Sequence, residues 1–569
     1  MKKLALAVAI IAAGAGAYWY SQQQGQGALS NPALDYIPAD TPIFSGQLTP
    51  FPIKDYLIAT AGNSAHLAQS PLLQEEMNEI TEPSVHFGVY LYKAYVEGLK
   101  DPAAMLKRFG LGEQSRGFFY TLGALPVARM EVADTAAFWK LMDEAEQASG
   151  WQHTKGTVAG QSYRSYLLSD ANDQDKVELV IADREGMVSV TLNTSFQDPK
   201  LLEHALGVTK VTNPLSGTTL LADIIKTHGF MDDSVSYINH QELVRAIVSG
   251  DNQLGKQLMS LFAKAGEDPF LELRTPECQA ELNAIAANWP RTVAGLTAMK
   301  VDSKQASMDM KMVLETRNEV VIKALDKMRG YIAGYVQKPG DSVMAMGLGL
   351  DVGQLAPSLN KVWNDFMSPR LQCQPLAELQ TEMEAANPAM LGMATAMADG
   401  VKGIGAAVLD YDLQVGNDAP SVKKLDALVS LSAEDPAFLF DMVKPFAPML
   451  GQIDLKSGDD VDLSDFIPTE FGVSAKLGLR GQHLVLYTGE RSQKLADSLK
   501  GETLVANGLF GMSADYGRLL APLMTLMEAS GEEIPEELEA LKDYKMQVQM
   551  GMDINEQGPV FNTGFVTKP

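Results

Sequence analysis

The chain has little positive charge for its length. Its 569 residues include 46 Lys and Arg against 71 Asp and Glu, which gives a formal net charge of −25. Nucleic acids are bound largely by Lys and Arg side chains that neutralise backbone phosphates, so we expect no nucleic-acid partner. The same shortage argues against docking of the protein body on anionic lipid. Acidity of this kind mainly keeps a protein soluble.

The common sequence marks of catalysis and of metal binding are also missing. No two of the seven histidines are four residues apart, and the chain has no G-x-S-x-G elbow, Walker lysine loop or dinucleotide fingerprint. Ser358 and Lys361 form one S-x-x-K tetrad, but neither S-D-N nor K-T-G accompanies it, so chance explains it better. We therefore predict no enzyme, no catalytic residue and no cofactor. The alternative is an exported hydrolase whose catalytic residues are dispersed along the sequence.

Cysteine is nearly missing, since Cys278 and Cys373 are the only two. Residues 1–17 resemble an export signal, with Lys2 and Lys3 before an apolar run, so the chain is expected to meet an oxidising compartment. A disulfide between Cys278 and Cys373 is then the default prediction, with buried thiols or intermolecular pairing as alternatives. Closing a loop of about 95 residues stabilises a fold by ~4 to 5 kcal/mol in the ideal case.

The first residues also predict the cellular location of the protein. Ala15 and Ala17 would suit signal peptidase, but the aromatic residues 18–20 resemble the belt that sits at the headgroups of a bilayer. We therefore interpret residues 1–20 as a signal peptide or membrane anchor, and residues 21–34 as a flexible stalk. The protein is expected in the periplasm, tethered to the inner membrane by residues 4–20, with no other membrane contact.

Two kinds of unit recur along the rest of the chain. One is a strand followed by a helix, and its copies are 39–57, 233–250, 341–360 and 508–524. The other is a strand followed by a capped amphipathic helix, at 123–150, 308–328 and 426–446. Asp134 and Asp435 are the predicted N-caps of two of these helices, while Thr316 and Glu319 have the spacing of a capping box.

The series of units repeats as a whole from about Asp341. Hairpin stretches at 177–207 and 473–501 match, and residues 293–302 align without gaps to 401–410, each preceded by a Cys-Gln pair. We infer an ancestral duplication, with residues 35–337 as the first half of the body and 341–569 as the second. The predicted fold class is α+β: internally duplicated modules of antiparallel sheet covered on one side by helices, after a single N-terminal apolar helix.

Two features bear on metals. Met-x-Met pairs at 308–312, 344–346 and 550–552 offer soft ligands for Cu(I), yet the same alternation fits a half-buried strand, and core packing is the favoured interpretation. A Met-rich groove that binds apolar ligands is an intermediate possibility between a Cu(I) site and core packing. Acidic loops at 170–175 and 454–465 lack the order of a calcium loop, so we interpret them as solvated and predict no metal-binding residues.

The N-terminal apolar segment, the stalk and the Pro38 to Thr41 strand resemble the opening of a family of long bacterial exported or membrane-anchored proteins of uncharacterised function. The resemblance covers about the first fifty residues and implies no site residues. From the repeats and the export segment we hypothesise a non-enzymatic cell-envelope protein that binds or scaffolds a polypeptide or an apolar or lipid ligand in the periplasm. Besides the hydrolase, copper or calcium handling is the other alternative.

Overall fold

A computed structural model of the chain describes residues 31–64, 82–170, 172–195, 197–338, 340–415, 421–446, 448–464, 474–530 and 545–567. The predicted anchor and most of the predicted stalk lie outside these residues. Within the described part of the chain, no helix combines the length and apolarity that a bilayer crossing requires.

The chain forms two compact units, which divide at Met312 and Val313. The first holds the residues up to Met312 together with the last three, and the second holds Val313–Val566. The predicted seam at 337–341 therefore lies inside the second unit. The reason is that residues 331–336, which have no regular secondary structure, pack into a core of the second unit.

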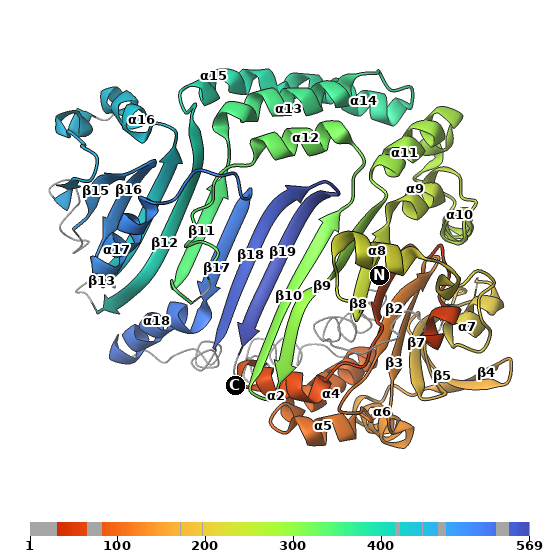
Figure 1. Cartoon of the computed structure of the whole chain (residues 1–569). Coiled ribbons are helices and arrows are strands. Elements are labelled where there is room, and N and C mark those ends of the chain that lie inside the picture. Colours follow the sequence, from red (N-terminus) through yellow and green to blue (C-terminus); the bar gives the residue numbers. More distant parts are fainter. Residues whose placement is uncertain are drawn as a thin grey trace. The chain divides into compact units, whose positions relative to one another are not determined.

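The first unit is built on antiparallel strands (Figure 1). They are β1 Ile43–Gln47, β2 Gly117–Leu122, β3 Leu125–Glu131, β4 Thr154–Val158, β5 Gln161–Leu167, β6 Val177–Arg184, β7 Met187–Thr194, β8 Ser234–Asn239, β9 Arg291–Asp302 and β10 Gln305–Leu314, the last of which runs across the unit boundary. Their order in the sheet is β4-β5-β6-β7-β3-β2-β1-β8-β9, and every neighbouring pair is antiparallel.

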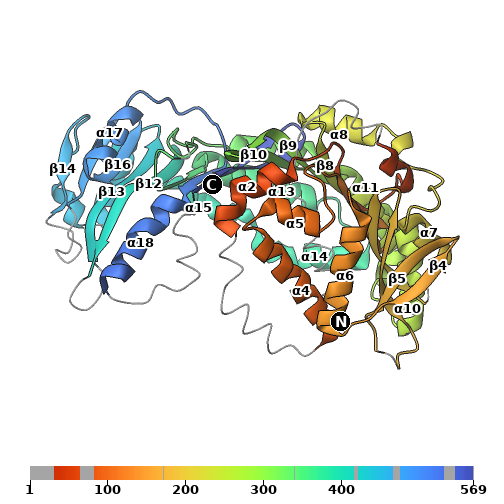
Figure 2. The same ribbon diagram turned by 90° about the horizontal axis from the view of Figure 1, so that it is seen from below.

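The helices of the first unit begin mostly at short polar or proline caps. They are α2 Ile53–Ser64, α4 Pro83–Gly98, α5 Pro102–Arg108, α6 Thr135–Ser149, α7 Pro199–Ala205, α8 Leu220–His228, α9 His240–Val248, α10 Gln253–Ala265 and α11 Pro276–Asn288. The Asp134 carboxylate accepts hydrogen bonds from the Ala136 and Ala137 amides, so the predicted N-cap of α6 is confirmed. Helices α4 and α6 lie side by side (Figure 2), joined by a hydrogen bond from the Tyr90 hydroxyl to Glu144.

The second unit has its own antiparallel strands. They are β11 Met344–Gly349, β12 Val401–Gln414, β13 Ser421–Ala433, β14 Asp460–Asp462, β15 Lys476–Arg480, β16 His483–Thr488, β17 Phe510–Asp515, β18 Met546–Asn555 and β19 Gly558–Thr567. Their order is β14-β15-β16-β13-β12-β11-β17-β18, again with antiparallel neighbours throughout.

The helices of the second unit are α12 Glu319–Met328, α13 Val352–Met367, α14 Gln374–Met383, α15 Leu391–Ala396, α16 Pro436–Val443, α17 Glu490–Leu499 and α18 Tyr516–Ser530. The predicted cap of α16 is confirmed, because Asp435 accepts from the Phe438 amide. The predicted capping box of α12 is wrong, since Asn318 caps that helix by accepting from the amides of Val320 and Val321. Asn318 is closer to the start of the helix, and its side-chain carbonyl oxygen accepts from these amides, while the Thr316 hydroxyl accepts from the Asn318 amide.

The predicted fold class is confirmed at its coarser level, as α+β with antiparallel sheet and covering helices. Each unit also has the same strand order: β1, β2, β3 and β7 of the first unit correspond in their pairing to β11, β12, β13 and β16 of the second. The stretches predicted as a strand followed by a helix form β1 with α2, β8 with α9, β11 with α13 and β17 with α18. In each unit the strands of two such stretches are neighbours, because β1 pairs with β8 and β11 pairs with β17.

Helices are not confined to one side of the sheet in the second unit. Val485 and Tyr487 of β16 belong to a core that also contains Leu499 of α17. Leu477 of β15 lies opposite Leu486 and packs with Phe440 of α16. Since successive residues of a strand point to opposite faces, α16 and α17 cover opposite faces of this edge, and the predicted one-sided covering is wrong here.

Candidate functional site

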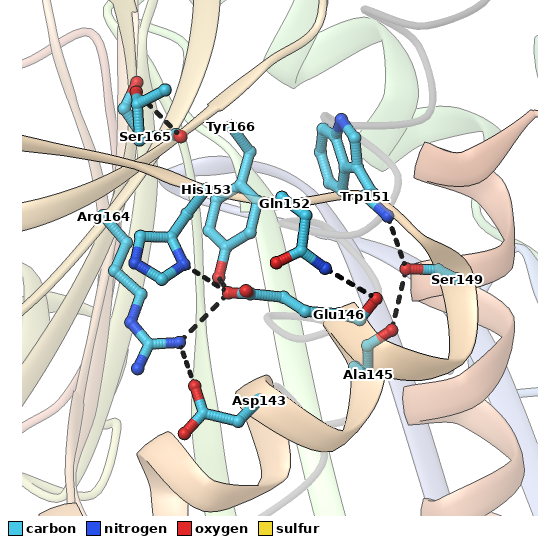
Figure 3. A network of polar contacts seen from close by, with 11 residues as sticks. Asp143, Ala145, Glu146, Ser149, Trp151, Gln152, His153, Arg164, Ser165 and Tyr166 are labelled. Atoms are coloured by element: carbon cyan, nitrogen blue, oxygen red, sulfur yellow. Dashed lines mark hydrogen bonds and ion pairs between the residues drawn. The ribbon is translucent and has the colours of Figure 1, made fainter.

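A group of ionisable side chains in the first unit surrounds Glu146 on α6 (Figure 3). Its side chain is 6% exposed, and Oε1 accepts a hydrogen bond from the Tyr166 hydroxyl at 2.7 Å and from Arg164 Nη1 at 3.0 Å. The Nδ1 atom of His153 lies 2.7 Å from the same oxygen. Arg164 also reaches Asp143 at 2.6 Å, and its guanidinium lies 4.4 Å from the centre of the Trp139 ring.

This network ties β5 to α6 rather than exposing a reactive group. Burial, and then the hydrogen bond to Glu146, raise the pKa of Tyr166, so its hydroxyl keeps its proton and stays a donor. A buried carboxylate needs such partners, because an unpaired charge away from water is costly. We therefore assign the Glu146 network a stabilising role.

The two residues of the S-x-x-K tetrad make no hydrogen bond with each other, because Ser358 Oγ is buried without a hydrogen-bond partner among the described residues. Both lie on α13, where Ser358 is buried and Lys361 is exposed. An activated serine needs a base within hydrogen-bond reach, and the described part of the chain shows no such contact at Ser358. The interpretation of this tetrad as chance stays a prediction.

A hydrogen-bonded serine and histidine are found elsewhere in the second unit. Ser432 Oγ lies 2.9 Å from Nδ1 of His483, and both residues are buried. Burial lowers the pKa of His483, which favours its neutral form. A substrate has no access to this pair while the sheet is intact, so the pair gives no support to the hydrolase alternative.

The acidic loops are partly engaged in pairs. Asp175 bonds Lys264 at 2.5 Å, and Asp460 accepts from Arg480 at 2.7 Å and from the Tyr487 hydroxyl at 2.6 Å. Asp465 lies outside the described residues. Within the described ranges, no group of three or more His, Cys, Asp or Glu residues is arranged to hold a metal ion.

Both cysteines are buried and disulfide-bonded. Since the chain has no other cysteine, the predicted disulfide between Cys278 and Cys373 is confirmed. This state fits an oxidising compartment.

One face of the second unit's sheet is apolar and accessible. Two rows of side chains cross it, and we call them together the open face. The first row is Met550, Met512, Met346, Ala406, Val429 and Leu486, and the second is Met552, Phe510, Leu348, Ile404, Leu431 and Leu484. Within each row neighbours are directly paired residues of β18, β17, β11, β12, β13 and β16, so their side chains share one face.

Exposure distinguishes this face from a core. Leu348 is 50% exposed, Ile404 47%, Met550 45% and Met346 43%. Neither row contains a polar residue. At the β16 end Leu484 packs against the α16 cluster, while the residues of β11, β12, β17 and β18 are left accessible or half-buried. Contiguous exposed apolar surface of this kind marks interaction sites on soluble proteins.

The opposite face of the same strands is closed. Tyr331, Ile332 and Val336 pack there, with Ala345 of β11 and Ala407 of β12 beneath them. Gly347, Gly403 and Gly405 make this approach possible, since a Cβ atom on Gly403 would be 2.0 Å from the carbonyl oxygen of Tyr331. Residues 331–336 fill this closed face of the sheet. The large side chains that alternate with these glycines point to the opposite face.

The first unit has different side chains at the corresponding strand pair. Its central strands β1 and β8 put Ser45 directly opposite Ser236, and the Ser236 hydroxyl donates to Ser45 Oγ at 2.9 Å. The second unit has Met346 opposite Met512 on its central strands. At this position the first unit therefore carries two hydroxyl groups where the second unit carries two thioethers.

Sequence reasoning weighed a Met-rich groove for apolar ligands but did not identify the open face, although a signal for it exists. Glycine alternates with large apolar residues in 346–349, 403–405 and 510–512. Such alternation predicts one face bare enough for close packing and another face made of large apolar groups. The core interpretation of the Met-x-Met pairs holds for Met308, which is 1% exposed, but not for Met346 or Met550.

Comparison of the chain with protein-family models, with characterised proteins and with solved structures gives no significant match in any of the three. The resemblance of the first fifty residues to an exported family stays a prediction.

Proposed function

We propose that the protein is a non-enzymatic cell-envelope protein that binds the apolar side of a polypeptide on the open face of its second unit. The observation that supports this most directly is the pair of in-register apolar rows, with Met346, Leu348 and Ile404 each more than two-fifths exposed. Methionine is enriched at the cores of protein interfaces and at surfaces that adapt to several partners.

The openness of the face favours a polypeptide over a small apolar ligand. Small ligands are held in concave pockets that bury most of their surface, whereas these side chains lie on an open sheet. An amphipathic helix or an apolar strand could cover both rows at once. Lipid or fatty acid binding is the alternative within the same proposal.

A periplasmic location is part of the same proposal. The disulfide agrees with export, and the predicted N-terminal segment would tether the body on the periplasmic side of the inner membrane. We further propose that the shared strand order of the two units arose by duplication of one ancestral module.

A binding measurement with defined peptides tests the proposal. A fluorescent amphipathic helical peptide of zero net charge should bind the full chain saturably in an anisotropy titration, and a scrambled peptide of the same composition should not. Ile404→Asp should abolish binding, because it buries a carboxylate under the peptide. Met259→Asp, at a residue of α10 that is 44% exposed, is the matched control and should bind like wild type.

Two outcomes would contradict it. Absence of saturable peptide binding would contradict the polypeptide proposal. Saturable binding of a fatty acid by the same protein would then favour the lipid alternative. Equal loss of binding in the control and in Ile404→Asp would show that the open face is not the site.

A further inference from the structure

The methionines of the open face gather around a single residue. Met512 on β17 has Met346 of β11 directly opposite on one side and Met550 of β18 directly opposite on the other. Direct antiparallel neighbours have Cβ atoms about 4.5–5.5 Å apart, which is well within the combined reach of two methionine side chains.

Two more methionines are diagonal neighbours of Met512. Met344 is paired with Ala514, two residues after Met512, and Met552 is paired with Phe510, two residues before it. Diagonal neighbours are about 7–8 Å apart, still within reach of long side chains. Five thioether sulfurs therefore belong to one small area of one sheet face.

The environment suits a soft cation. Thioether sulfur is a soft ligand that selects Cu(I) among biological metals. The paired positions around Met512 hold no carboxylate, hydroxyl or imidazole that would favour a harder ion, since their other occupants are Ala514, Phe510 and Val548. Met346 and Met550 are each more than two-fifths exposed, so an ion has access from solvent.

We propose that Met346, Met512 and Met550 form a binding site for a soft monovalent cation, Cu(I) or its analogue Ag(I), with Met344 and Met552 as further available donors. The ion binds by forming sulfur–metal coordination bonds and losing water, with no change of oxidation state. The proposal goes beyond polypeptide binding. Leucine at these positions would also offer an apolar surface to a peptide, but only methionine offers sulfur to a metal ion.

The disulfide makes the site easier to isolate. Both cysteines are disulfide-bonded, so no thiolate competes for the ion in the oxidised protein. The negative net charge of the chain also favours the approach of a cation.

Silver titration of the oxidised full-length protein tests the proposal without a reductant. Wild type should bind Ag(I) tightly in isothermal titration calorimetry, and the ¹³C-methyl NMR signals of Met346, Met512 and Met550 should shift. The triple variant M346L/M512L/M550L should lose this tight binding. Exchange of methionine for leucine keeps the volume and usually costs less than about 1.5 kcal/mol, so the variant is expected to fold.

A second triple variant is the matched control. Met390, Met393 and Met397 lie in and beside α15 and are 75%, 81% and 55% exposed. M390L/M393L/M397L should keep the tight site. The proposal is overturned if the strand triple binds Ag(I) as wild type does, or if the helix triple loses the tight site instead.

The two proposals fail separately in this design. The strand triple keeps an apolar open face, so it should still bind the amphipathic peptide. Loss of silver with retained peptide binding supports both proposals, whereas retained silver with retained peptide binding overturns the metal site alone.

Discussion

The backbone of Gly403 in β12 packs against the carbonyl oxygen of Tyr331 so closely that a side chain at residue 403 has no room. The contact fixes which face of the second unit's sheet is closed. The other face, with Met346, Leu348 and Ile404, is thereby left as the accessible one.

Gly403→Ala should destabilise the second unit by about 1–3 kcal/mol, because the added methyl group would force the Tyr331 segment away from the sheet. Urea unfolding followed by tryptophan fluorescence measures the change. Gly392→Ala is the control, since a Cβ atom there meets nothing within 4 Å and alanine favours the helix α15. Equal destabilisation by both changes would show that the Gly403 contact is unimportant.

Glu146→Gln should destabilise the first unit by on the order of 3 kcal/mol, because the half-buried Arg164 and the buried Tyr166 lose their charged partner. Asp143→Asn removes a second carboxylate from the same arginine, but the Asp143 side chain is 61% exposed. It should cost less than about 1 kcal/mol. Denaturant midpoints of the two variants compare a buried with an exposed partner directly, and similar values would contradict the assigned role of Glu146.

Replacing both cysteines should weaken the fold without preventing it. The disulfide closes a loop of about 95 residues, so Cys278→Ala with Cys373→Ala should lower the free energy of unfolding by up to ~4 to 5 kcal/mol. Wild type should also resist alkylation under denaturing conditions until a reductant is added, as intact mass shows. Alkylation of the unreduced, unfolded protein would disprove the disulfide.

Acidification should destabilise the second unit through His483. Burial lowers the pKa of His483 in the folded protein, so below its unfolded value of about 6.5 the unfolded chain binds more protons. Stability therefore falls as the pH drops from about 6.5, at no more than about 1.4 kcal/mol per pH unit from this one group.

The variant His483→Gln should show a shallower loss of stability over the same pH range. Unfolding free energies at pH 7.5, 6.5 and 5.5 measure the slope. His204→Gln, a change of a histidine that bonds the Thr209 carbonyl at the surface, accounts for the general effect of losing an imidazole. A slope for His483→Gln equal to that of wild type would contradict the argument.

Local parts of the fold could be predicted from the sequence. The caps at Asp134 and Asp435 were predictable because a short acidic side chain bonds amides only two or three residues away. The stretches in which a helix follows a strand were predictable because the apolar period changes within a few residues.

Long-range relations could not be predicted in this way. Ser45 and Ser236 are 191 residues apart in the sequence, and no local sequence pattern predicts that their strands are neighbours. Accessibility of the open face was hidden for the same reason, because alternation at Met344 to Gly349 predicts a two-faced strand but not which face is covered. That depends on residues 331–336, which have no periodicity to read.

The matching central strands of the two units have a consequence for specialisation. One backbone pattern carries a pair of hydroxyl groups, Ser45 with Ser236, and its counterpart carries a pair of sulfurs, Met346 with Met512. Because these side chains belong to the outward face and not to a core cluster, point substitutions can change the surface chemistry of either unit while the strand pairing stays as it is.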